Sequence, residues 1–114
     1  RAVEAIKRAG FTVESSVGTN PRYSVQFSEE AGALDCYSKT ISHRANPTKN
    51  FAAIMTCSDA DENCPMIIGA EYREAITYED PKVADRTANE TYVYDERCQQ
   101  IATEMLYLFS LVRQ

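Results

Sequence analysis

Two cysteines flank an acidic segment near the middle of the chain, within NFAAIMTCSDADENCP from Asn50 to Pro65. Cys57 and Cys64 are separated by six residues, so a redox role requires a thiolate at one sulfur and a partner within disulfide reach. The carboxylates between the two cysteines disfavour that thiolate, because a nearby negative charge raises the pKa of a thiol. The residues alone leave two interpretations open: a redox pair, or two unreactive thiols of which one is buried at a strand end.

Asp80 is the other candidate for chemistry, because a carboxyl group whose pKa is raised by partial burial can act as a general acid. The alternative is an Asp-Pro turn with Pro81, and residue chemistry alone favours the turn. His43, the single histidine, has no nucleophile near it in sequence and receives no role. No metal or cofactor is expected, since the acidic run from Asp59 lacks the glycine and glutamate of a calcium loop and the cysteine spacing does not suit zinc.

The composition limits the class of protein. A chain of 114 residues suits one domain over residues 1–114, and a net charge of -5 without a Lys/Arg cluster argues against nucleic acid as a partner. The apolar run Met105 to Val112 is too short to cross a membrane. The chain opens on Arg1 with no signal-peptide pattern, which predicts a cytoplasmic protein with reduced thiols and a piece of a longer chain.

Periodicity predicts the strands that would position the candidate residues. Asn50 to Thr56 is a continuous apolar run, typical of a strand buried on both faces of a parallel sheet. Ligands bind beyond the carboxyl ends of such strands, which is where Cys57 falls. Ala75 to Tyr78 is predicted as the last strand. Alternation over Tyr23 to Phe27, followed by Leu34 to Ile41, predicts a hairpin.

Helices are predicted at both ends of the chain. Arg1 to Ala9 has helical spacing and a left-handed cap at Gly10, and Asp59 to Asn63 forms a short helical turn. The segment from Phe11 to Pro21, which follows this first helix, is expected to have no regular secondary structure and to end in a turn. A long final helix begins at a capping box from Thr87 to Glu90. Its apolar stripe consists of Tyr94, Cys98, Ile101, Met105, Leu108 and Val112.

Two motifs in this order resemble a known family. The run Met55-Thr56-Cys57-Ser58-Asp59-Ala60-Asp61-Glu62-Asn63-Cys64-Pro65, then Tyr78-Glu79-Asp80-Pro81 and the long helix, is similar to the low-molecular-weight phosphotyrosine phosphatase superfamily. Within it, the chain most resembles a bacterial subgroup of the thioredoxin-coupled arsenate reductase branch. The resemblance implies a three-layer, flavodoxin-like α/β fold with parallel strands. This fold would lack the N-terminal strand and phosphate-binding loop and would carry an inserted hairpin over Tyr23 to Ile41.

The resemblance also implies roles for the candidate residues. Cys57 and Cys64 match the pair that relays oxidation to thioredoxin, and Asp80 matches the general acid, with arsenate or a phosphate-type oxyanion as substrate. The family's nucleophile lies in a loop of a cysteine, five residues and an arginine, which cradles the oxyanion. That loop is missing from this sequence. The residues six positions after its four cysteines are, in order, Ser42, Asn63, Ala70 and Glu104, and none of them is arginine.

Three functions remain open from the sequence. The first is the C-terminal part of a phosphatase or arsenate reductase, inactive by itself because the nucleophile is missing. The second is a non-catalytic assembly module that is completed by another chain or forms homo-oligomers through an exposed sheet edge. The third is a redox domain that uses only Cys57 and Cys64.

Overall fold

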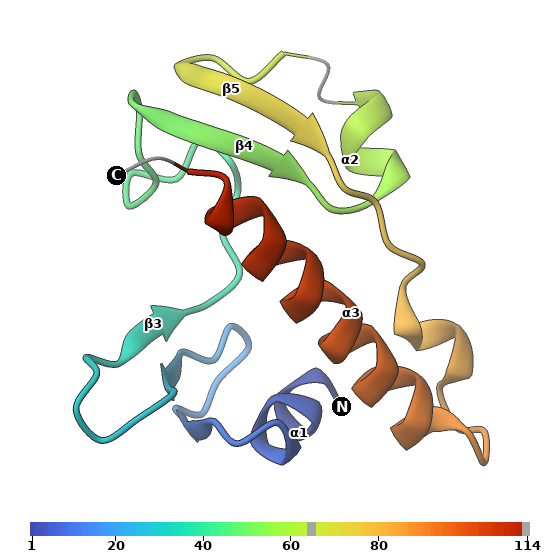
Figure 1. Cartoon of the computed structure of the whole chain (residues 1–114). Helices are drawn as coiled ribbons and strands as arrows, with labels where there is room; N and C mark the ends of the chain where they lie inside the picture. Colours follow the sequence, from blue (N-terminus) through green and yellow to red (C-terminus); the bar gives the residue numbers. More distant parts are fainter. Residues whose placement is uncertain (64–65, 113–114) are drawn as a thin grey trace. The chain divides into compact units, whose positions relative to one another are not determined.

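The structure is a computed structural model that describes residues 1–63 and 66–112. Its helices and strands are mixed α/β, as predicted (Figure 1). The chain divides into two compact units, which are described separately: a first unit of Arg1–Ser38 with Pro81–Gln114, and a second unit of Lys39–Asp80. Within the described ranges, no helix combines the length and apolar character needed to cross a bilayer.

Helix α1 (Ala2–Arg8) ends in the predicted glycine cap. Gly10 has φ +101°, and its N–H donates to the carbonyl of Lys7 at 3.0 Å. The N–H of Phe11 donates to the carbonyl of Ile6 at 3.2 Å. These two bonds form a Schellman motif, which satisfies carbonyls that the helix end leaves without partners.

Helix α3 (Glu90–Ser110) begins three residues later than the predicted capping residue, and Asn89 occupies the N-cap without a side-chain bond. The Thr87 hydroxyl instead donates to the Ala84 carbonyl at 2.8 Å, and the Glu90 carboxylate accepts the N–H of Arg86 at 2.6 Å. The capping box between Thr87 and Glu90 was therefore a wrong prediction. The short 3₁₀ helix η1 (Pro81–Ala84) and the left-handed Arg86, at φ +64°, use these groups for the preceding turn.

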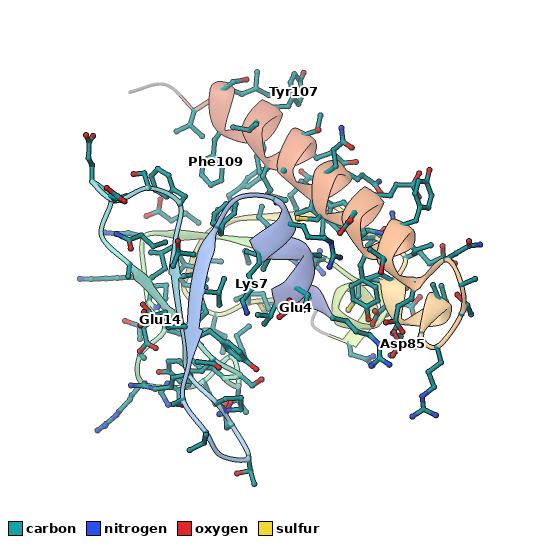
Figure 2. The ribbon with its side chains drawn as sticks, turned by 90° about the horizontal axis from the view of Figure 1, so that it is seen from below. Glu4, Lys7, Glu14, Asp85, Tyr107 and Phe109 are labelled. Atoms are coloured by element: carbon teal, nitrogen blue, oxygen red, sulfur yellow. The ribbon has the colours of Figure 1, made fainter. Side chains whose placement is uncertain are left out.

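The predicted apolar stripe lies on one side of α3. Its members within the helix are half-buried, and Val112, beyond the helix end, is exposed. Helix α1 packs against α3 (Figure 2), and Ala5 of α1 is only 3% exposed. The stripe is therefore the packing face that sequence periodicity predicted.

Three short antiparallel strands complete the first unit: β1 (Thr12–Ser15), β2 (Tyr23–Gln26) and β3 (Leu34–Cys36). The β2–β3 hairpin confirms the prediction, although β3 is shorter than the Leu34 to Ile41 strand expected. Beyond β3, the Asn20 side chain takes the place of a strand partner, accepting the N–H of Ser38 at 3.2 Å and donating to its carbonyl at 3.0 Å. Strand β1 was not predicted from the sequence, because its segment was expected to have no regular secondary structure.

The second unit contains a parallel pair, β4 (Phe51–Met55) and β5 (Ala70–Ala75), connected through α2 (Ser58–Asn63). The central strand and the short helix agree with the predictions. The last strand does not, because β5 ends at Ala75, where the Ala75 to Tyr78 strand was expected to begin. Burial of β4 on both faces was also wrong, since Met55 is 7% exposed but Ala52 is open to solvent.

Candidate functional site

The carboxyl end of the β4–β5 pair brings two distant segments together. After β5 ends, the N–H of Ile76 donates to the carbonyl of Met55 at 3.0 Å. The N–H of Tyr78 then donates to the carbonyl of Thr56, also at 3.0 Å. The chain therefore continues alongside the exit of β4 without forming a regular ladder, and both segments leave the sheet at the same edge.

This edge carries two of the predicted site residues. Cys57 directly follows Thr56 and precedes α2, and Asp80 lies two residues beyond Tyr78. In parallel sheets, side chains at this edge are the ones that meet ligands. The third predicted residue, Cys64, lies outside the described residues.

Both described candidates are exposed to solvent. The partial burial that a general acid with a raised pKa would need is not observed at Asp80. The burial of a thiol at the strand end is not observed either, because Cys57 is exposed. Exposure leaves both groups accessible to a reagent or to another protein segment.

His43 lies in the loop before β4, away from the sheet edge in sequence. It is half-buried, and its Nδ1 accepts the N–H of Ala45 at 3.1 Å. This local bond orders the loop. Across residues 1–63 and 66–112, no group of three or more His, Cys, Asp or Glu side chains could hold a metal ion.

The second unit also has an open hollow of about 630 Å³, which reaches β4 at Phe51, the first residue of that strand. It is lined by uncharged side chains, namely Ile41, Ser42, Asn46, Pro47, Phe51, Asn63, Met66, Ile67 and Ile68. An oxyanion needs positive charge or converging N–H groups. The hollow therefore reaches the amino end of β4, and no charged side chain lines it among the described residues.

Compared with known protein families, with curated proteins and with solved structures, the chain matches none. The resemblance to low-molecular-weight phosphatases therefore stays a prediction from the two sequence motifs. The structure adds that Thr56 of the first motif and Tyr78 of the second are joined by a backbone hydrogen bond beyond the carboxyl end of β4.

Sequence reasoning missed the residues that join the motifs. Tyr78 acts through its backbone N–H, and Thr56 acts through its carbonyl. A signal was present, because Ile76 and Tyr78 alternate in sequence with the more polar Thr77 and Glu79, the pattern of an extended segment. That alternation was interpreted as a strand of its own rather than as the continuation of β5.

Proposed function

We propose that this chain supplies the general acid and the relay thiols of a domain like the low-molecular-weight phosphotyrosine phosphatases. The thioredoxin-coupled arsenate reductases have the most similar motifs, and the flavodoxin-like, three-layer fold is part of the proposal. The observation that supports it is the 3.0 Å hydrogen bond from the Tyr78 N–H to the Thr56 carbonyl. That bond holds the segments of Cys57 and Asp80 at the edge where α/β sheets bind ligands.

Each residue has a chemical role in this proposal. Asp80 donates a proton to the leaving oxygen, and Cys57 with Cys64 accepts oxidising equivalents as a disulfide that thioredoxin reduces. The oxyanion-binding loop with its nucleophilic cysteine would have to be supplied from outside this sequence, because no cysteine here is followed six positions later by arginine. Exposure of Cys57 suits a thiol that must meet such a loop and a partner protein, whereas Asp80, exposed in this chain, would gain the burial of a general acid only when such a loop covers it.

The relay is expected to change the shape of α2. Cys57 directly precedes this six-residue helix, and Cys64 follows it in sequence. The six residues of the helix advance about 9 Å, whereas the Cα atoms of a disulfide lie within about 7 Å. We therefore expect α2 to unwind when a Cys57–Cys64 disulfide forms.

Thiol counting tests the relay. Treatment with diamide, which takes up the two protons and two electrons, is expected to lower the count of titratable thiols from four to two. Peptide mass spectrometry should assign the lost pair to Cys57 and Cys64, and reduced thioredoxin should restore both. Circular dichroism should show a loss of helix on oxidation.

Two serine variants make this experiment specific. Cys57→Ser should abolish the intramolecular disulfide, whereas Cys36→Ser should leave it unchanged, since Cys36 is an exposed thiol on β3. Cys57 and Cys64 that stay reduced under diamide, or a disulfide that forms equally well in Cys57→Ser, would remove the relay from the proposal.

A further inference from the structure

We draw no further inference here: the strongest candidate, the open hollow of about 630 Å³ that reaches the amino end of β4 in the second unit, is a largely apolar surface, and nothing among the described residues shows what covers it.

Discussion

Gly69 shows how a single residue positions the candidate site. It has φ +88°, and it directly precedes β5. A Cβ atom at this position would collide with the carbonyl oxygen of Thr48 and lie 3.0 Å from its carbonyl carbon. Only glycine combines this dihedral angle with such a close approach. The contact helps to fix where β5 begins beside β4, and hence which residues leave the sheet next to Cys57.

Replacement of this glycine should therefore be costly. Gly69→Ala is expected to lower the free energy of unfolding by about 2 kcal/mol or more, from the left-handed backbone together with the clash. Gly32→Ala is the control, because a Cβ at Gly32 would meet no atom within 4 Å. That variant should stay within about 0.5 kcal/mol of the original chain in urea unfolding. Equal losses in the two variants would contradict the role assigned to Gly69.

At the scale of elements, charged groups join α1 to α3 at both ends of the short helix. Arg1 lies 2.8 Å from Glu90 and 3.3 Å from Asp85, and Arg8 forms a bidentate pair with Asp95. The N–H of Arg86 and then the Arg1 guanidinium lower the pKa of the Glu90 carboxyl below its usual range. These partners are partly exposed, so each contributes modestly.

The lowered pKa of Glu90 predicts a dependence of stability on pH. A carboxylate whose pKa is lower in the folded chain than in the unfolded chain stabilises the fold above its unfolded value, about 4.3. This stability is lost as the pH falls through the folded pKa of Glu90. Glu90→Gln should therefore reduce the loss of stability seen in urea unfolding below about pH 4.

Glu96→Gln serves as the control on the same helix. Glu96 is exposed, and its carboxylate accepts only a long bond, 3.4 Å, from the Tyr92 hydroxyl. This variant should keep the acid dependence of the original chain. Identical acid profiles for Glu90→Gln and the original chain would show that the bonds of Glu90 add nothing to stability.

At the scale of the whole molecule, each unit has few buried apolar side chains to form a hydrophobic core. The buried apolar residues among those described are Ala5, Met55 and Ala84, while larger side chains such as Phe27 and Leu34 remain exposed. The parallel sheet has two strands, although parallel sheets are usually covered on both faces. This small interior agrees with the proposed function, in which a nucleophile loop is supplied from outside this sequence.

The proposed function also predicts the result of a catalytic assay, because the proposed mechanism needs a nucleophile loop that is missing from this sequence. The 114-residue chain is expected to hydrolyse p-nitrophenyl phosphate no faster than buffer, since acid catalysis without a nucleophile and an oxyanion cradle has nothing to act on. Asp80→Asn should leave that rate unchanged. A rate above buffer that falls in Asp80→Asn would show that the chain has a complete active site.

Local patterns were sufficient for much of the fold. The helix ending at Gly10, strand β2, the central strand β4 and the long helix α3 were predicted within a few residues. Each depends on contacts between near neighbours or on the periodicity of a single face. The residue types and order of the two motifs likewise identified Cys57 and Asp80 as candidates before their positions in space were known.

Tertiary structure decided the rest, because hydrogen-bond partners far apart in sequence leave no local periodic signal. The end of β5 depends on its register with β4, and the short β3 depends on the side chain of Asn20. The start of α3 depends on how Arg86 and Thr87 close the preceding turn. The sequence determined which residues could do chemistry. Only the bond between Tyr78 and Thr56 decided that two of their segments share one sheet edge.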